Sequence, residues 1–382
     1  MQSTQEKDFT RREAVLAVSL ELSKGSWKIG LHDGRREKPT VRSVSNEAAS
    51  ERLAEAVKVI EETRRKWGLS EAVRVVVVYE AGQDGFWIHR ALTALGDEVL
   101  IVDPASIPVE RRARRAKTDR LDAIKLVMAL RAWLRGEHDR MHVIRVPTEE
   151  AEAQRQLVRD RGELQKEIQQ HGDRLRKLLR TVGCWDGVDD LARRLERGEV
   201  KRHDGRALPM ELQARLRGEC ERLALAKKQL AALEAALMER LPTPIRERIT
   251  HLMQLKGVGR VGAIRLALEL FWRRFSSRRQ VGACVGLAPQ PYDSGESRVD
   301  QDISKAGNRR VRSLVVEMSW MWVRYQPGSA LARWFAQRTQ GAGGNKRSRR
   351  IAIVAVARRL VIALWRYLED GVIPEGAALK TA

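Results

Sequence analysis

Four carboxylates in the N-terminal part of the chain have the side-chain type that phosphodiester chemistry on a metal ion requires. Glu21 and Glu80 each lie at or near the end of a short apolar run, and Asp119 and Asp122 lie three positions apart. Clustered carboxylate oxygens bind Mg²⁺, which stabilises the charge that develops when a phosphodiester is cut. If the fold brings these side chains together, they form a site for one or two magnesium ions.

A run of basic side chains precedes the two aspartates, in the stretch RRARRAKTDRLD. Four clustered acids repel a nucleic-acid backbone, so cations beside them would draw that substrate toward the metal ions. The five cations are Arg111, Arg112, Arg114, Arg115 and Lys117. The alternative is a solvated charged segment, followed by two acids that only stabilise a helix N-terminus through its dipole.

A second reactive group lies in the C-terminal third, in the stretch DSGESRVDQDISKAGNRRVR. Ser294 precedes Gly295 in a segment without periodicity, which predicts a loop. Its hydroxyl could attack a phosphodiester while cations stabilise the transition state, although Asp-Ser-Gly is also an ordinary turn. No histidine lies nearby in sequence to activate the hydroxyl. The candidate nucleic-acid contacts are Lys305, Asn308, Arg309, Arg310 and Arg312.

The elements that must position the acids have the order of an α/β sheet. Apolar or β-branched runs predict five strands, at 14–22, 26–32, 40–44, 73–80 and 98–103. Helices are expected over 46–67, capped by Asn46 and ended by Gly68, over 86–95, and after a Thr118 N-cap. This order predicts an RNase H-like fold. In that fold the ends of the first and fourth strands and the start of the last helix meet at one edge.

From Glu149 the apolar period changes to that of long amphipathic helices. Residues spaced by seven predict two coiled-coil helices, with seam positions Leu157, Leu164, His171 and Leu178 in one and Leu216, Leu223, Leu230 and Leu237 in the other. The link between the two helices is rich in glycine and charge. An antiparallel hairpin and a dimer arm both fit this pattern.

The stretch LKGVGRVGA has the spacing of a helix-hairpin-helix. Gly257 and Gly259 allow a tight turn, and the exposed backbone N–H groups at the next helix N-terminus can hold a phosphate. Arg260 adds a cation to that turn. The alternative is an ordinary packing hairpin, so this motif is not specific by itself.

Composition favours a nucleic acid as the partner. The chain has 72 Lys and Arg against 50 Asp and Glu, a formal net charge of +22, which attracts a polyanion. No lipidation signal or basic amphipathic helix with bulky anchors points to a membrane, and the N-terminus has no apolar signal core. The cysteines, Cys184, Cys220 and Cys284, fit no disulfide framework or zinc spacing. These features predict a soluble protein of a reducing compartment.

Two blocks of motifs resemble the insertion-sequence 110 family, the DEDD transposases. SLELSK, YEAG and KTDRLDA resemble the acidic tetrad of a RuvC-like domain, and LKGVGRVGA with ISKAGNRRVR resembles the family's C-terminal domain. The resemblance covers nearly the whole chain in the family's order. It implies a RuvC-like DEDD nuclease domain over 1–148, a coiled-coil dimerisation segment over 149–241 and a mostly α-helical C-terminal transposase domain over 242–382.

The resemblance also implies a mechanism. Glu21, Glu80, Asp119 and Asp122 would hold Mg²⁺, and Ser294 would form a transient phosphoserine link to the DNA of a mobile element. Members of this family assemble as dimers and tetramers, and the better understood ones pair an element-encoded RNA with donor and target DNA. The expected partners are therefore DNA, a guide RNA and further copies of the chain. The resemblance also implies a cytoplasmic, nucleoid-associated prokaryotic protein.

One position departs from the family pattern, which has Asp in the first strand where this chain has Glu21. The carboxylate is kept and extended by one methylene, so a metal ion could sit differently; Asp33 and Asp103 are nearby acids that do not fit the pattern. Two alternatives remain open at this point. One is a RuvC-like invertase or junction resolvase, and the other is a catalytically inactive nucleic-acid-binding protein.

Overall fold

The computed structural model describes residues 15–82, 84–107, 118–294, 297–340 and 345–380, without the side chains of residues 105 and 292–301. The chain divides into two compact units, Met1–Val146 and Pro147–Ala382. Each unit has its own hydrophobic core and is described by itself. The three-part division with boundaries at 148 and 241 stays a prediction.

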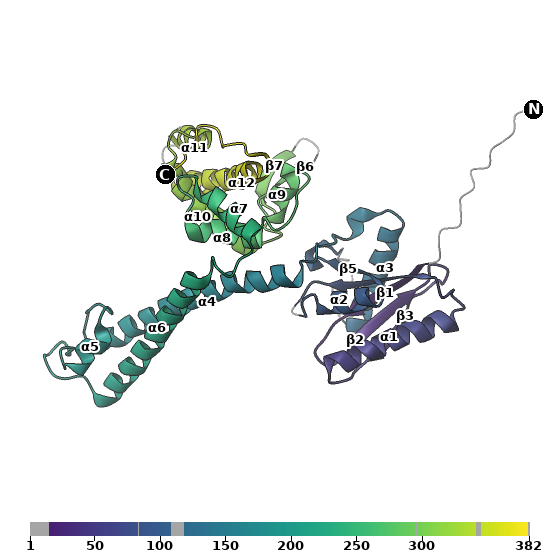
Figure 1. The fold of residues 1–382 in the computed structure, drawn as a ribbon, viewed down its shortest axis with the longest axis horizontal. Coiled ribbons are helices and arrows are strands. Elements are labelled where there is room, and N and C mark those ends of the chain that lie inside the picture. Colours follow the sequence, from purple (N-terminus) through teal and green to yellow (C-terminus); the bar gives the residue numbers. More distant parts are fainter. Residues whose placement is uncertain (1–14, 83, 108–117, 295–296, 341–344, 381–382) are drawn as a thin grey trace, which may run out of the picture. The chain divides into compact units, whose positions relative to one another are not determined.

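The first unit is built on a five-stranded mixed sheet in the order β3-β2-β1-β4-β5 (Figure 1). Its strands are β1 (Val15–Glu21), β2 (Trp27–His32), β3 (Thr40–Val44), β4 (Arg74–Glu80) and β5 (Glu98–Val102). β2 runs antiparallel to both β1 and β3, whereas β1, β4 and β5 are parallel. This topology confirms the predicted RNase H-like α/β fold, with β1 at the centre and β4 beside it.

Helices cover both faces of this sheet. Residues of α1 (Ala49–Lys66) and α2 (Trp87–Ala94) pack with Leu16, Val18 and Tyr79 in one apolar cluster. α3 (Asp119–Leu134) packs with Ala17 and Val78 in another. Short 3-10 turns lie at Pro104–Ser106 and His138–Arg140. Apolar side chains of these helices cover both faces, which explains why the central strands are almost continuously apolar in sequence.

Two of the three predicted helix-end signals are confirmed. Thr118 caps α3 by accepting a hydrogen bond from the Leu121 N–H, and Gly68, with φ of +63°, follows the end of α1. The prediction of Asn46 as the N-cap of α1 is wrong, because that helix begins only at Ala49. The Asn46 carbonyl instead accepts a 2.7 Å hydrogen bond from Nε of Arg52. The chain before the helix is held by a side chain of its first turn.

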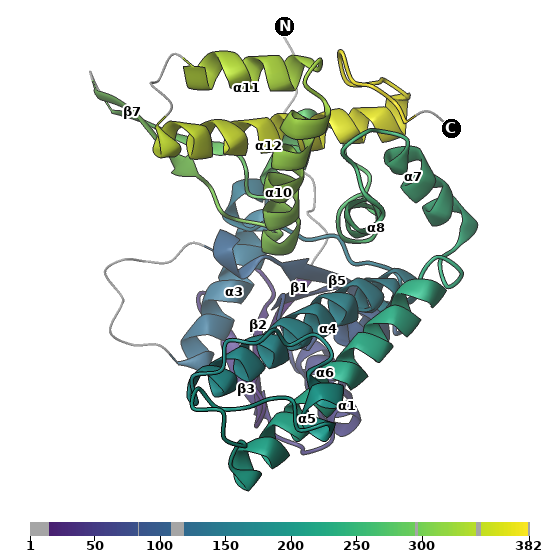
Figure 2. The same ribbon diagram turned by 90° about the vertical axis from the view of Figure 1, so that its left-hand side faces the viewer.

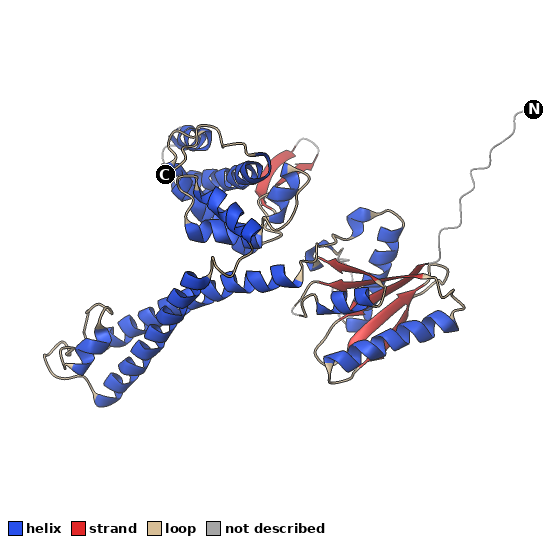
Figure 3. Cartoon of the chain, viewed as in Figure 1, coloured by secondary structure: helices blue, strands red, loops and turns tan. Residues whose placement is uncertain are grey.

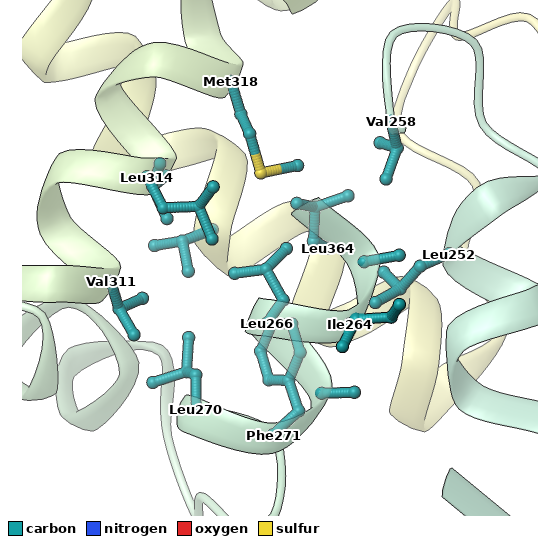
Figure 4. Packing of buried hydrophobic residues seen from close by; sticks show 14 of the residues in the cluster. Leu252, Val258, Ile264, Leu266, Leu270, Phe271, Val311, Leu314, Met318 and Leu364 are labelled. Carbon is teal, nitrogen blue, oxygen red and sulfur yellow. The ribbon is translucent and has the colours of Figure 1, made fainter. Parts of the chain in front are cut away.

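The second unit is helical in its described residues apart from one two-stranded hairpin (Figure 3). Its helices are α4 (Glu149–Arg180), α5 (Leu191–Glu196), α6 (Met210–Ala236), α7 (Thr243–Met253), α8 (Arg260–Glu269), α9 (Arg278–Cys284), α10 (Arg309–Tyr325), α11 (Ala330–Gln340) and α12 (Lys346–Asp370). The hairpin joins β6 (Pro289–Ser294) to β7 (Ser297–Ile303). In Figure 4, Leu266 of α8 and Leu270, the residue that follows α8, lie in one core with Val311 and Leu314 of α10.

α4 and α6 form a long antiparallel hairpin within one chain, which is one of the two arrangements that the heptads allowed (Figures 1 and 2). Arg161 Nε donates to the Glu234 carboxylate at 2.7 Å, and His171 faces Glu219. Leu216 and Leu223 of the predicted seam are buried at the interface. A coiled-coil dimerisation role for this segment stays a prediction.

A buried carboxylate, Glu219, fixes the pairing of α4 and α6. Its side chain is 5% exposed and accepts from Arg174 Nη1 at 2.9 Å, from Arg222 Nη1 at 3.0 Å and pairs with His171 Nδ1 at 2.7 Å. Burial alone would raise the pKa of Glu219. The hydrogen bonds from His171 and Arg174 outweigh burial and hold that pKa below its usual range. The ionised carboxylate is therefore the stable form in the hairpin.

We expect Glu219→Ala to lower the free energy of unfolding by about 2 kcal/mol, less than for a fully buried pair because Arg174 and Arg222 reach solvent. The pKa of Glu219 is lowered in the folded protein. Its contribution to the free energy of unfolding is therefore complete above the ordinary glutamate pKa and is lost as the pH falls through the pKa of the folded state. Thermal or urea unfolding at neutral and acidic pH measures both effects. Glu221→Ala, at an exposed neighbouring position, is the control. Equal stability of the two variants at neutral pH contradicts the prediction.

None of the helices in the described residues combines the length and the apolar character needed to cross a membrane.

Candidate active site

Glu21 and Glu80 lie side by side at the end of the first unit's sheet where its parallel strands finish; we call this end of the sheet the acid edge. β1 and β4 are parallel, and Leu20 pairs with Tyr79, so Glu21 and Glu80 are the next residues on adjacent strands. Each is the last residue of its strand and is half-buried. Parallel strands end at a common edge, so the two carboxylates start from neighbouring backbone positions.

The alternation of each strand puts both glutamates on the face that α3 covers. In β1, Ala17 belongs to the α3-side cluster, and Glu21 lies four residues further along the strand. In β4, Val78 belongs to that cluster, and Glu80 follows two residues later. Because side chains of a strand repeat with a period of two, Glu21 and Glu80 share this face.

Contacts at Ser19 place the start of α3 above the same edge. The Ser19 hydroxyl donates a 2.7 Å hydrogen bond to the Ala123 carbonyl, and both residues are buried. The end of α3 lies toward the other edge, because the space beside Gly34, which follows β2, is filled by Arg131. α3 therefore runs antiparallel to β1, and its first turn reaches the edge at which Glu21 lies.

Asp119 and Asp122 continue the sheet-facing side of α3 beyond its apolar residues. Asp119 lies one turn before Ala123, and Asp122 lies one turn before Leu126; Ala123 and Leu126 are both buried. Asp119 is exposed and Asp122 is half-buried. The helix thus changes from apolar to acidic residues where it passes the edge of the sheet, and four carboxylate positions share one edge and one face.

The carboxylates are not gathered into a finished ligand shell. Asp122 Oδ1 accepts from Lys125 Nζ at 3.2 Å. Among the described residues, no three histidine, cysteine, aspartate or glutamate side chains lie close enough together to hold one metal ion. The five predicted cations, Arg111, Arg112, Arg114, Arg115 and Lys117, lie outside the described residues.

The other two acids considered from the sequence are placed differently. Asp33 follows β2, which is antiparallel to β1, so it lies at the opposite edge; its Oδ1 accepts from the N–H groups of Arg35 and Arg36. Asp103 follows β5 at the same edge as Glu80, but Val102 before it packs on the α3 side. The strand alternation then turns Asp103 to the opposite face.

Gly30 in the middle of β2 permits the close approach of α3. A Cβ at this position would lie 2.5 Å from the Ser19 hydroxyl oxygen and 2.8 Å from the Ala123 carbonyl oxygen. The Ala123 carbonyl oxygen is a backbone atom of α3, and the Ser19 hydroxyl is held in place by its hydrogen bond to that carbonyl. A methyl group at residue 30 has to push α3, and with it Asp119 and Asp122, off the sheet.

We expect Gly30→Ala to cost about 1–3 kcal/mol of stability, the usual range for overpacking a core. It should also reduce DNA cleavage, because the acids of α3 move away from Glu21 and Glu80. Gly25→Ala is the matched control, since a Cβ there meets nothing within 4 Å. Thermal unfolding and a cleavage assay on the folded protein give the two measurements. A Gly30→Ala protein as stable and active as Gly25→Ala shows that this contact does not position the acids.

The structure places Ser294 at the end of a strand, and the prediction of a loop is wrong at this residue. β6 and β7 form an antiparallel ladder in which Ser294 pairs with Ser297. Cross-strand hydrogen bonding supplies order that sequence periodicity does not reveal, because the bonds of the ladder join backbone groups whatever the side chains are. The serine therefore lies at the tip of a hairpin.

The cations and amide that follow the hairpin have several structural contacts. Asn308 caps α10 by accepting from the N–H groups of Arg310 and Val311, and its Nδ2 donates to Glu269 at 3.2 Å. Arg312 Nη1 donates to the Lys305 carbonyl at 2.9 Å, and Lys305 Nζ contacts Asp302 at 3.0 Å. These bonds hold the turn before α10.

Arg309 and Arg310 are exposed at the first positions of α10. Among the candidates of this segment they present their side chains most openly to solvent, together with Lys305. An anion at this helix start would meet their charges and the helix dipole together.

The glycine turn lies between α7 and α8, as the sequence predicts. Gly257 has φ of +80°, a conformation that favours glycine, and Gly259 is the exposed N-cap of α8. Arg260 Nη2 donates to the Glu234 carbonyl at 3.3 Å. The C-terminal tail lies along this turn through a bridge between Leu255 and Leu379. Its use as a phosphate clamp stays a prediction.

Three positioning residues were missed from the sequence. Ser19 and Gly30 hold α3 on the sheet, and Gly30 could have been noticed as a glycine inside a strand, which indicates a close backbone approach. Glu269 is 6% exposed and holds Asn308, and it interrupts the apolar run LALEL. A charge inside a buried stripe signals a specific partner.

Comparisons with known proteins match both regions. A family model described as "Transposase" covers residues 28–183, and one described as "Transposase IS116/IS110/IS902 family" covers residues 249–334. The first range contains Glu80, Asp119 and Asp122, and the second contains Ser294 and Asn308. Glu21 lies before the first range.

Relatives match over much longer stretches. The protein y4rJ of Sinorhizobium fredii, which bears the name of a transposase, is 40% identical over 382 residues, 96% of this chain and 95% of y4rJ. A second protein of that organism, y4qE, is 31% identical over 264 residues, 66% of this chain and 60% of its own. The transposase for insertion sequence element IS1328 of Yersinia enterocolitica is 24% identical over 304 residues, 78% of this chain and 85% of its own.

Proposed function

Because this chain belongs to the IS116/IS110/IS902 family of transposases, and so cleaves and transfers DNA, we propose that it uses two sites for this reaction. One is a magnesium site on the RNase H-like unit, formed by Glu21, Glu80, Asp119 and Asp122. The other is Ser294, which becomes linked to DNA for a time. The proposal is supported by the neighbouring positions of Glu21 and Glu80 at the ends of adjacent parallel strands, and by the contact of Ser19 with α3, whose first turn carries Asp119 and Asp122.

The acid edge fits a divalent metal ion, a cofactor that the DEDD family also suggests. All four donors are carboxylates, the hard oxygen ligands that Mg²⁺ prefers. Mg²⁺ held there would stabilise the negative charge of the reacting phosphodiester and lower the pKa of a bound hydroxyl group. Glu21 and Glu80 approach from adjacent strand ends, and α3 supplies Asp119 and Asp122 on a helix fixed by Ser19. The one-methylene extension at Glu21 is compatible with this edge, since its strand position is beside Glu80.

At the second site, the Ser294 oxygen would attack phosphorus. The Ser294 hydroxyl gives its proton to a base, the bond between Oγ and phosphorus forms, the ester bond to the leaving sugar oxygen breaks, and that oxygen takes up a proton. Arg309 and Arg310 offer positive charge close in sequence, and Asn308 orders the backbone from which they project. We propose that the base that accepts the serine proton comes from the magnesium site or from another subunit.

We further propose that the nucleic-acid contacts include Gly257, Gly259 and Arg260 at the α7–α8 turn, and Lys305, Asn308, Arg309, Arg310 and Arg312 near the hairpin. An element-encoded guide RNA would pair with donor and target DNA. Both nucleic acids would bind to the positively charged side chains of the protein. A homodimer or homotetramer would bring the two kinds of site together. The proposed place of action is the prokaryotic nucleoid.

The decisive experiment traps the covalent intermediate. The protein is incubated with labelled element-end DNA, the RNA transcribed from the element's non-coding flank, and Mg²⁺, and is then denatured. We expect labelled DNA to stay on the protein and to map to the peptide that contains Ser294, only when Mg²⁺ is present. Cleavage of branched DNA without an adduct supports a junction resolvase, and DNA binding with neither cleavage nor adduct supports an inactive binder.

A further inference from the structure

A charged hollow of about 540 Å³ lies on the second unit, where α4, α8 and α10 meet. Its charged lining consists of Arg159, Arg161, Lys166, Arg265 and Arg310 with Glu163, Glu269 and Glu317. Gln165, Gln169 and Ser313 add neutral hydrogen-bonding groups. We call this surface the α4–α10 groove.

Only some of the cations in the groove are neutralised by close carboxylates. Arg161 is paired with Glu234 at 2.7 Å, and Lys166 is paired with Glu163 at 3.0 Å. Arg159 and Arg310 each lie 4.0 Å from a carboxylate oxygen, which is too far for a hydrogen bond. These two guanidinium groups keep most of their capacity to bind another anion.

Arg265 adds a third cation of the same kind. Its Nη2 donates to the Arg310 carbonyl at 3.3 Å, and in the described part of the chain no ion pair joins it to an acid. Burial lowers the pKa of Arg265, with Glu269 and Glu317 partly offsetting that effect. A desolvated guanidinium gains more from an added anion than one in water does.

An orphaned donor shows that the groove is not satisfied by the protein itself. The Nε of Arg159 is buried and has no hydrogen-bond partner among the described residues. Buried polar groups in native proteins usually have a partner, so this donor calls for an acceptor supplied from outside. A phosphate oxygen meets that need, because arginine binds phosphate in a planar, bidentate geometry.

The groove also lies beside the segment that carries the serine chemistry. Glu269 lines the groove and accepts from Asn308, which caps α10. The hairpin of Ser294 ends at Ile303, and α10, which brings Arg310 to the groove, begins at Arg309. We propose that the α4–α10 groove binds the phosphate backbone of the DNA strand that Ser294 processes. Arg159, Arg265 and Arg310 contact the phosphates, while Glu269 positions Asn308. This inference rests on the proposed function of Ser294.

The test measures binding to labelled duplex DNA without Mg²⁺, so that no chemistry is required. The variants are Arg159→Gln, Arg265→Gln and Arg310→Gln, each alone and in pairs. We expect each to weaken binding about tenfold near 0.1 M salt and to reduce the slope of log K against log salt by about one, the effect of one lost phosphate contact. Arg215→Gln, an exposed arginine of α6 outside the groove, is the matched control for charge.

Circular dichroism and thermal unfolding identify any variant that fails to fold; Arg310→Gln, at an exposed position, keeps the test valid if Arg265→Gln is unstable. Unchanged DNA affinity and salt slope in folded Arg159→Gln and Arg310→Gln proteins overturn the proposal. The proposal is also overturned if the variants lose affinity for single-stranded RNA but not for duplex DNA, because the groove would then bind the guide RNA. This test measures DNA binding and not adduct formation. A negative result therefore rejects the groove as a DNA-binding site without rejecting the proposed role of Ser294.

Discussion

Asp119→Asn protein is expected to keep its fold and its affinity for DNA while cleavage falls by about three orders of magnitude, the scale expected when a metal-centred charge is lost from a phosphoryl-transfer site. The change removes one negative charge and alters the volume hardly at all. Asp119 is exposed at the start of α3, so its side chain supports no core packing. Rates of strand cleavage on element-end DNA with its RNA measure the effect.

A second measurement separates a metal ligand from a residue that only shapes the helix start. Mn²⁺ serves as the probe, and its electron paramagnetic resonance signal reports the bound fraction. We expect wild type to bind Mn²⁺ and Asp119→Asn to bind it more weakly. Asp33→Asn is the matched control, because Asp33 lies at the opposite edge of the sheet. If the two variants bind Mn²⁺ equally well, Asp119 is not a ligand of the metal ion.

Ser294→Ala protein is expected to form no covalent DNA adduct and to lose strand transfer by about four orders of magnitude or more, as when a catalytic nucleophile is deleted. The substitution removes one hydroxyl oxygen at the tip of the β6–β7 hairpin. Backbone pairing with Ser297 does not need that hydroxyl. Binding of DNA and RNA should therefore stay unchanged.

Ser297→Ala provides the control for Ser294→Ala, since it removes the same group from the residue paired across the hairpin. Gel analysis after denaturation compares adducts and transferred strands. If Ser294→Ala still cuts branched DNA at the wild-type rate, the chain acts as a resolvase through its acids alone. If both variants lose the adduct equally, the reaction depends on the integrity of the hairpin, and Ser294 is not identified as the nucleophile.

Much of the first unit follows from local sequence. The β-branched run before Glu80 predicts a buried strand because a parallel sheet covered on both faces needs apolar residues at almost every position. Thr118 predicts the start of α3 because its hydroxyl satisfies an N–H group that the helix leaves unpaired. At Asn46 the same local rule is wrong, since the Arg52 guanidinium binds the backbone there and the helix begins later.

The sequence by itself determined which reactive groups the chain offers: the acids, the serine, the excess of cations and the succession of strands and helices along the chain are all local properties of residue type and spacing. Only the tertiary structure decided that Glu21 and Glu80 share a face, that Ser19 and Gly30 hold α3 above them, and that arginines of three helices line one groove. These relations join residues up to about a hundred positions or more apart, such as Ser19 and Ala123, whose separation is 104. Local pattern carries no information on such pairs, because they form only when separate apolar faces are buried against each other.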